Sequence, residues 1–246
     1  MPRHLLLRLQ APLIAFGGET IDNFGVIRRF PALSMVTGLL ANALGYDRSE
    51  TDLHNRLQAR LVIGTRLEAE GRQERDYQTA RLNQDDKGWT TSGSPEGREP
   101  SPSYSSDQSG RKSLTLQRYR DYHADLHALI ALRLRDTTDT PTLDDLALAL
   151  DRPARPLFVG RKPCLPTCRL FAGWCEADSV LSALAAQPKE ADVRLAVQWP
   201  AGEGVLPGMH ASDLCDERNW LSGVHGGWRP VLEGRLPTSS AEGAGQ

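Results

Sequence analysis

The 246-residue chain is poor in cysteine and in aromatic residues, and it has no excess of either charge. Its four cysteines are too few for a disulfide scaffold at this length and are most simply reduced thiols, so we assign no bridges. Lysine and arginine total 29 residues against 31 acidic residues, a balance that provides no general attraction to nucleic acid or to an anionic membrane. Any site for a polyanion must therefore be local.

Long apolar runs are missing as well. No window approaches the roughly 18 uncharged apolar residues that a membrane span requires, and the start, "MPRHLLLRLQAP", is too short and too charged for a secretory signal. We therefore expect a cytoplasmic protein with no membrane partner. Hydrophobic residues still make up 39% of the chain, which is enough for the core of one large domain or two small ones.

Familiar catalytic and metal motifs are also absent. The sequence contains no G-x-x-x-x-G-K-[ST], G-x-S-x-G or H-E-x-x-H, so nucleotide hydrolysis, serine esterase and zinc-protease chemistry lack support. Cys164 and Cys168 have the spacing of zinc ligands, and Cys175, His210 and Cys215 could complete a site. Because a proline lies inside this one close pair, we prefer apolar packing of the thiols and expect no metal or cofactor.

Hydrophobic periodicity predicts a β-α-β unit at the start of the chain. In "HLLLRLQAP", the side chains of Leu5, Leu7 and Leu9 fall on one face of a strand. A helix follows from about Ser34 and ends at Gly45. Its apolar positions are Val36, Leu39, Leu40, Ala43 and Leu44. The stretch "ARLVIGTRLEA" alternates like the first strand and completes the unit.

The pattern then breaks and returns. From Gly71 to Ser113 the residues are mostly polar, which indicates an insertion or a flexible loop. A strand in "HADLHALIALRLR" and a helix in "PTLDDLALALDRP" follow, the helix with a capping box at Thr142 and Asp145. Further strands are predicted in "RLFAGWC" and "DVRLAVQW", with a short helix in "DSVLSALAA" between them. The sum is an α+β chain on the ferredoxin-like plan with appended C-terminal pieces.

Positive charge is concentrated in "VIRRFPALSMVTGLLANALG", where Arg28 and Arg29 directly precede the first predicted helix. Unpaired N–H groups and the positive end of the helix dipole favour an anion there, and two guanidinium groups can bind phosphate oxygens bidentately. From this stretch alone, a solvated pair of arginines is an equal alternative. The neighbouring residues favour phosphate, because glycines permit close approach and phenylalanine rings permit stacking. These neighbours are Gly17, Gly18, Gly25, Phe16, Phe24 and Phe30.

Two further basic clusters occur downstream. In "RKSLTLQRYRDYH" the cations Arg111, Lys112, Arg118 and Arg120 alternate with aromatic residues, a mixture that suits single-stranded RNA. An exposed strand edge protected by charge is the alternative. In "RPLFVGRKPCLP", prolines on both sides of the "GRK" triplet would hold two cations in a fixed place. These cations are Arg161 and Lys162, and a basic surface turn is the alternative.

An RNA-cleaving enzyme is a separate possibility. A general base would deprotonate a ribose 2′-hydroxyl, and a cation would stabilise the transition state. The candidates are His4, His54, Tyr119, His123 and Lys112, although their spacing is not diagnostic. A metal-dependent nuclease would need carboxylates clustered in the core, whereas the paired aspartates of this chain fall in a polar loop and in the first turn of a helix.

Four segments carry a family resemblance, in order along the chain. "LLLRLQAPLIAFG", "RRFPALSMVTGLLANALG", "RDYQT" and "RPLFVGRKPCLPTCRLFAG" resemble the CasD-type subunits, of the RAMP superfamily, of the type I-E CRISPR surveillance complex Cascade. The resemblance runs through most of residues 3–185. The arginine-Phe-Pro entry to the first helix and "PLFVGRK" are its most specific pieces, because order and spacing agree as well as composition.

The resemblance implies a modified ferredoxin-like fold, RRM-like and RAMP-like, with a projecting thumb hairpin. Residues 1–150 would form the main domain, including an inserted thumb at about 70–122. Residues 151–236 would form a β-rich extension with the basic "GRK" loop, and 237–246 a disordered tail.

The resemblance also implies a function. Such subunits hold the 5′ handle of the CRISPR RNA, cap one end of the ribonucleoprotein complex in antiviral defence, and contact CasC-type backbone subunits and the CasA-type large subunit. Target DNA would be met only through the complex. The family is non-catalytic in type I-E, but type I-C relatives cut RNA, so a metal-independent endoribonuclease of repeat RNA stays the alternative. The residues carried over are Arg28, Arg29, Arg161 and Lys162.

Overall fold

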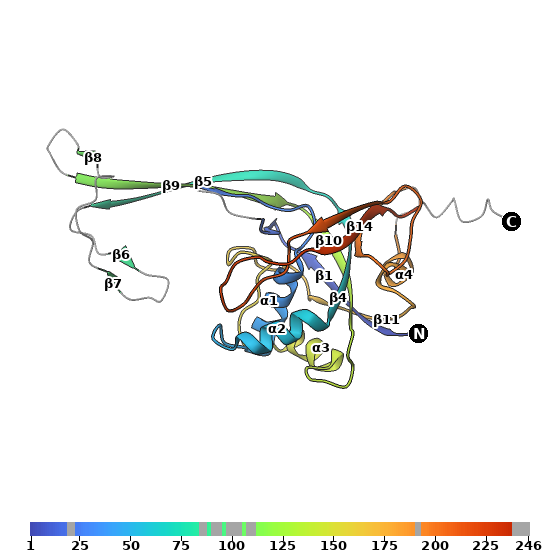
Figure 1. The fold of residues 1–246 in the computed structure, drawn as a ribbon. Helices are drawn as coiled ribbons and strands as arrows, with labels where there is room; N and C mark the ends of the chain where they lie inside the picture. The colour runs from blue at the N-terminus through green and yellow to red at the C-terminus, as the bar shows by residue number, and fades with distance from the viewer. Residues whose placement is uncertain are drawn as a thin grey trace. The chain divides into compact units, whose positions relative to one another are not determined.

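The structure is a computed structural model, and it describes residues 1–18, 23–83, 88–89, 95–96, 105–106, 112–189 and 193–237 (Figure 1). It divides the chain into two compact units. The first unit comprises Met1–Gly17, Ile27–Glu74 and Tyr122–Gln246, and the second comprises Gly18–Val26 and Arg75–Asp121.

The first unit is a mixed α+β structure built on one large antiparallel sheet. The seven strands lie in the order β11-β1-β10-β4-β12-β14-β13. Their bounds are β1 Arg3–Gln10, β4 Leu61–Ala69, β10 His127–Leu134, β11 Phe171–Glu176, β12 Ala196–Pro200, β13 His210–Leu214 and β14 Arg229–Arg235. The helices in the described residues are α1 Leu33–Leu44, α2 Thr51–Arg60, α3 Leu143–Asp151 and α4 Val180–Ala185. None of these helices is long and apolar enough to cross a membrane.

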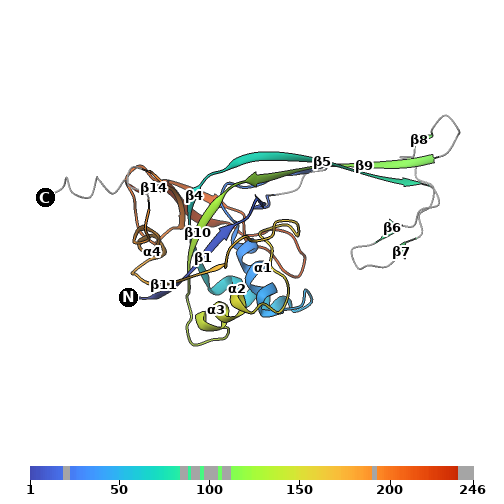
Figure 2. The same cartoon turned by 180° about the vertical axis from the view of Figure 1, so that it is seen from behind.

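One face of the sheet is covered by α1, α2 and α3 (Figure 2). As predicted, the odd-numbered leucines of β1 are buried here, and Leu5, Leu7 and Leu9 are each 0% exposed. They share a core with Leu40 of α1 and Leu146 of α3. The predicted apolar face of β10 lies in the same core, so the alternating patterns identified the buried side of both strands correctly.

The second face of the sheet carries a smaller core. Leu6 of β1, Val62 of β4 and Leu129 of β10 pack there against Val180 and Leu184 of α4. This helix has only six residues, and it begins after Ser179, whose side chain accepts a hydrogen bond from the Ser182 N–H at 3.1 Å. A helix of this length covers only part of the face.

The predicted helix ends are confirmed at two places. The α1 helix ends at Gly45, whose φ of 86° is left-handed and accessible mainly to glycine. The α3 helix has the predicted capping box, in which the Asp145 N–H donates to Thr142 and the Thr142 N–H donates to the Asp145 carboxylate. Hydrogen bonds from Thr142 lower the pKa of the Asp145 carboxyl.

For the stretch after Gly71, the structure agrees with the predicted insertion, because Arg75–Asp121 belong to a separate unit, but the alternative of a flexible loop is wrong for the first part. Residues Arg72–Asn83 form the strand β5, which pairs with β9, Lys112–Ala124. Most of residues 84–111 of the predicted insertion and residues 238–246 of the predicted tail lie outside the described residues. Residues 72–81 of β5 are exposed, so neither face of this part of the strand is buried and no apolar alternation marks it.

The second unit is a narrow β structure. Its strands are β3 Phe24–Gly25, β6 Gly88–Trp89, β7 Pro95–Glu96 and β8 Ser105–Ser106, with parts of β5 and β9. A row of rings crosses it, because Tyr119 lies 5.1 Å from Phe24 and 5.1 Å from Tyr77 between ring centroids. Arg75 forms a bidentate ion pair with Asp121 at 2.6 and 3.0 Å. Cross-strand stacking and ion pairing join the described strands of this unit.

Candidate nucleic-acid interface

Two of the three predicted basic clusters flank one short segment of the first unit, residues 14–17. On one side the Ala15 N–H donates to the Val159 carbonyl at 3.2 Å. On the other side the Arg28 N–H donates to the Phe16 carbonyl at 2.6 Å, and Gly17 forms an isolated antiparallel β-bridge with Ile27. The structure therefore brings together the arginine loop, residues 27–30, and the glycine loop, residues 158–164.

The glycine loop is held rigidly against this segment. Gly160 has a φ of 90°, and a Cβ atom built there would lie 1.8 Å from the Ala15 carbonyl oxygen, so only glycine fits. The Val159 N–H donates to the Cys164 carbonyl and the Cys164 N–H donates to the Arg161 carbonyl, both at 2.8 Å. Burial raises the pKa of the Cys164 thiol, as expected for a protonated, packed cysteine.

The charged part of the glycine loop lies beside the end of β9. The Arg161 guanidinium carbon is 4.9 Å from the Tyr122 ring centroid, a cation–π distance. The next residue, His123, places Nε2 2.8 Å from the Arg28 carbonyl oxygen, which requires a proton on Nε2. Lys162 is exposed. The rings of Tyr122 and His123 thus connect the two loops.

The start of α1 differs from its prediction. The Asp216 carboxylate accepts the Leu33 N–H at 2.9 Å, and its carbonyl accepts the Ser34 N–H at 3.0 Å. Asp216 is 0% exposed and is paired with Arg229 at 3.0 and 2.6 Å. The expectation of unpaired N–H groups for a phosphate at this helix start is therefore wrong, because a side chain from the C-terminal part of the protein is the anion there.

The two arginines of the arginine loop have different partners. Arg28 donates through Nη2 to the Cys215 carbonyl at 2.9 Å, next to the buried Asp216, and so supports the C-terminal segment. Arg29 forms an ion pair with Glu70 at 2.7 Å, and Arg235 approaches the same carboxylate at 3.4 Å. Arg29 also lines a surface groove.

This basic groove was not predicted. It has a volume of about 540 Å³. Its charged lining residues are Arg29, Arg194, Glu233 and Arg235, and His210 lies among them. Arg194 and Arg235 are 41 residues apart, and they meet because β12 pairs with β14 and Arg235 donates to the Arg194 carbonyl at 3.0 Å. No local sequence pattern contains this pairing, although each arginine is visible by itself.

The remaining basic cluster belongs to the second unit. Arg118 donates to the Asn23 side chain at 2.5 Å, and Arg120 is the strand partner of Gly25. Lys112 begins β9, and Arg111 lies outside the described residues. Tyr119, one of the predicted aromatic residues, occupies the centre of the ring row that crosses this unit.

The predicted ribonuclease histidines are each held by a different carbonyl. His4 Nδ1 is 3.0 Å from the Pro2 oxygen, His54 Nδ1 is 2.8 Å from the Glu50 oxygen, and His123 binds the Arg28 oxygen. His54 also lies 4.5 Å from the Trp220 ring. Within the described part of the chain, no group of three His, Cys, Asp or Glu side chains could hold a metal ion. The four cysteines are free thiols.

Comparison with known proteins defines first a class and then a family. The class is that of the CRISPR-associated proteins, because the family model described as "CRISPR-associated protein (Cas_Cas5)" matches residues 4–232. Within this class the chain belongs to the Cas5 family.

One curated relative and two solved structures agree with this assignment. The "CRISPR system Cascade subunit CasD" of Escherichia coli (strain K12) is 29% identical over 185 residues, which are 75% of this chain and 76% of that protein. A chain of a "CRISPR RNA-guided surveillance complex" superposes with a TM-score of 0.67 at 21% identity, covering 95% of this chain and 90% of that one. The "Crystal structure of Cas protein" gives 0.59 at 24% identity, covering 96% and 95%. The two structures share the fold.

Proposed function

We propose that this protein is an RNA-binding subunit of a Cascade-type surveillance complex, that it holds the 5′ handle of the CRISPR RNA, and that it caps one end of the complex. The observation that carries the proposal is the joining of the arginine loop and the glycine loop around residues 14–17. The name of the E. coli relative, a Cascade subunit, supports the assembly context. Membership in the Cas5 family supports it as well.

The geometry suggests separate roles for the cations. Gly160 fixes the glycine loop, so Arg161 and Lys162 stand on a rigid support and lose little entropy on meeting phosphates. Arg161 lies against Tyr122, a ring that orients its guanidinium. Arg29 would extend the phosphate path into the basic groove, whereas Arg28 positions the loop through the Cys215 carbonyl.

The charge distribution fits binding of one defined RNA end. The chain carries a formal net charge of −2, so unrelated nucleic acid would gain little from the protein as a whole. Cations concentrated in two adjoining loops attract strongly only an RNA whose phosphate backbone can pass along both loops. Local charge on a near-neutral body therefore favours the correct RNA segment over others.

We also propose a modified ferredoxin-like, RAMP-type core. The strands β11, β1, β10 and β4 lie side by side in that order, and α1 precedes β4 as α3 precedes β11, which supports this plan. Residues 1–150 would then be the main domain with a thumb at about 70–122. The stretch 151–236 would be its extension.

The proposed partners are those of the resemblance: CasC-type backbone subunits, the CasA-type large subunit, and target DNA through the assembled complex. The role is non-catalytic. His4, His54 and His123 each engage a backbone carbonyl, which supports a structural use of these rings rather than proton transfer.

The test is charge reversal on the glycine loop in the assembled complex. Arg161→Glu with Lys162→Glu should weaken handle RNA binding at least tenfold and lower the salt slope of the binding constant by about 1.4, since each single-strand phosphate contact contributes about 0.7. The matched control reverses Arg48 and Arg152, two exposed arginines of other loops. Unchanged assembly with full-length guide RNA would refute the proposal. Specific cleavage of labelled repeat RNA in chelator would establish the endoribonuclease instead.

A further inference from the structure

The second face of the sheet contains a pocket beyond the end of α4. Leu6, Leu129 and Val180 are packed together near the helix. Farther along the strands, Arg8 of β1 stands opposite Leu129 of β10, and Leu129 stands opposite Arg66 of β4. The next row pairs Gln10 with His127. The space above these rows has a volume of about 300 Å³.

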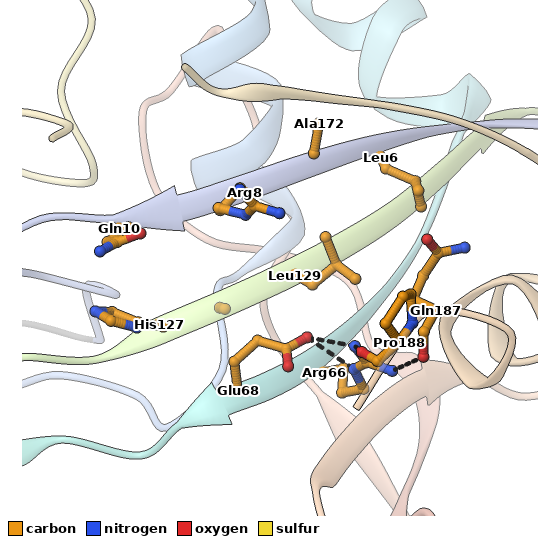
Figure 3. Close-up of a pocket in the computed structure, with 11 residues that line it drawn as sticks. Leu6, Arg8, Gln10, Arg66, Glu68, His127, Leu129, Ala172, Gln187 and Pro188 are labelled. Atoms are coloured by element: carbon orange, nitrogen blue, oxygen red, sulfur yellow. Dashed lines mark hydrogen bonds and ion pairs between the residues drawn. The ribbon is translucent and has the colours of Figure 1, made fainter. Parts of the chain in front are cut away.

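The pocket is lined by both apolar and polar residues. Figure 3 shows Arg8 and Gln10 on β1, His127 and Leu129 on β10, and Glu68 on β4 around it. The apolar lining residues are Leu6, Ala128, Leu129, Ala172 and Pro188. The polar ones are Arg8, Gln10, Arg66, Glu68, His127 and Gln187. Small-molecule sites usually combine these two kinds of surface, and this volume is at the lower end of their range.

One of the two arginines in the pocket has a structural role. Arg66 is 1% exposed, and it donates to the Glu68 carboxylate at 2.8 Å through Nε. It also donates to the carbonyls of Leu184, Gln187 and Pro188 at 2.7, 3.1 and 2.9 Å. The Glu68 carboxylate neutralises the charge of Arg66, and the bonds to the carbonyls tie the segment at the end of α4 to β4 (Figure 3).

The other arginine is different. Arg8 is exposed, and within the residues that the structure describes its guanidinium makes no hydrogen bond or ion pair. Because Arg66 and Glu68 cancel, Arg8 is the one cation without a paired acid among the described residues that line the pocket. Its five N–H donors remain available for an anionic ligand.

We propose that this pocket accepts one unpaired nucleotide of a bound single-stranded RNA, an inference that rests on the proposed function. The base would lie on Leu129 and Ala172, and its polar edge would meet Gln10 and His127. The adjacent phosphate would bind Arg8 bidentately. A carboxylate from a partner protein would match Arg8 alone, whereas a nucleotide supplies an apolar face, a polar edge and an anion in one unit.

Site-specific crosslinking tests the location. The full chain is bound to guide RNAs that each carry one 4-thiouridine in the handle segment, irradiated, digested and analysed by mass spectrometry. We expect one position to crosslink within residues 6–10 or 127–129, and other positions to crosslink within 158–164. Absence of crosslinks to 6–10 and 127–129 at every position overturns the pocket proposal. Crosslinks to 158–164 report separately on the proposed function.

Binding measurements test the chemistry. With a fluorescent octauridylate probe, Arg8→Ala should weaken binding about tenfold and reduce the salt slope by about 0.7, the share of one phosphate. Arg48→Ala, another exposed arginine, should leave both unchanged. Arg8→Lys should recover the slope but only part of the affinity, because an ammonium cannot bind bidentately.

Three outcomes separate the hypotheses. Unchanged affinity and slope in Arg8→Ala overturn the pocket proposal while leaving the Arg161/Lys162 result intact. Loss of a partner subunit in Arg8→Glu with RNA affinity preserved also overturns it, because the occupant is then a protein. If reversal at Arg161 and Lys162 has no effect but Arg8→Ala weakens RNA binding, the nucleotide pocket stands and the proposed handle interface fails.

Discussion

The two faces of the seven-stranded sheet are made by the same strands but are used differently. On one face α1, α2 and α3 exclude water from an extended core. On the other face α4 covers only one end, and Arg8, Gln10 and His127 face an open pocket. Leu7 and Leu9 are 0% exposed while Arg8 between them is exposed. Because side chains along a strand alternate between the two faces, neighbouring residues of β1 serve different purposes: one stabilises the core, and the next is available for contact with a ligand.

We expect the largest loss of stability from a change at the start of α1, the first helix on the covered face. Asp216→Ala removes the carboxylate that caps α1 and leaves the Arg229 guanidinium, which is 9% exposed, without its partner. We expect the free energy of unfolding to fall by about 4 kcal/mol, measured by urea denaturation. The double replacement of Asp216 and Arg229 by leucine should cost less, because no buried charge is left unpaired. A loss below about 1 kcal/mol for Asp216→Ala would contradict the capping role.

The next prediction compares neighbours on one strand. Leu7→Ala removes a fully buried side chain from the covered face and should cost about 3 kcal/mol of unfolding free energy. Arg8→Ala on the open face should change it by no more than about 0.5 kcal/mol. Equal losses for the two variants would mean that the two faces contribute alike, and the comparison would fail.

The smallest effect is a pH dependence at the covered end of the second face. His4 is 0% exposed, and burial lowers its pKa from the usual 6.5. The unfolded chain therefore takes up a proton below pH 6.5 that the folded protein resists, so stability is full above that pH and falls as the pH decreases toward the folded-state pKa. The His4→Gln variant should lack this component in urea titrations over the acidic range. Parallel curves for the two proteins would disprove it.

Much of the first unit could be predicted because its signals are local. Alternating leucines identified β1 and β10, Gly45 ended α1, and the Thr142–Asp145 pair began α3. The helix α2 was missed because its buried face includes polar residues whose partners are distant in sequence. Gln58, for example, donates to the Arg218 carbonyl at 3.0 Å. Hydrophobic periodicity cannot detect such a face.

The candidate interface shows the same division. Composition and resemblance singled out Arg28, Arg29, Arg161 and Lys162, and whether these bind RNA stays a prediction. The different supporting role of Arg28 depends on Cys215, 187 residues away. Arg194 and Arg235 were missed because only strand pairing brings them to one groove. The spacing of charged residues along the sequence does not reveal which of them the register of paired strands brings together.

The carboxylate that caps the first helix lies 183 residues beyond the amide it accepts. During synthesis, the segment of α1 leaves the ribosome long before Asp216 has been translated, so the nascent helix lacks its capping carboxylate for most of translation. Contacts between residues so distant in sequence form slowly, and until this one forms, apolar surface of the unfinished fold is exposed to chaperones and proteases. C-terminal truncations that remove this aspartate should therefore reduce the yield of soluble protein more than their small length suggests.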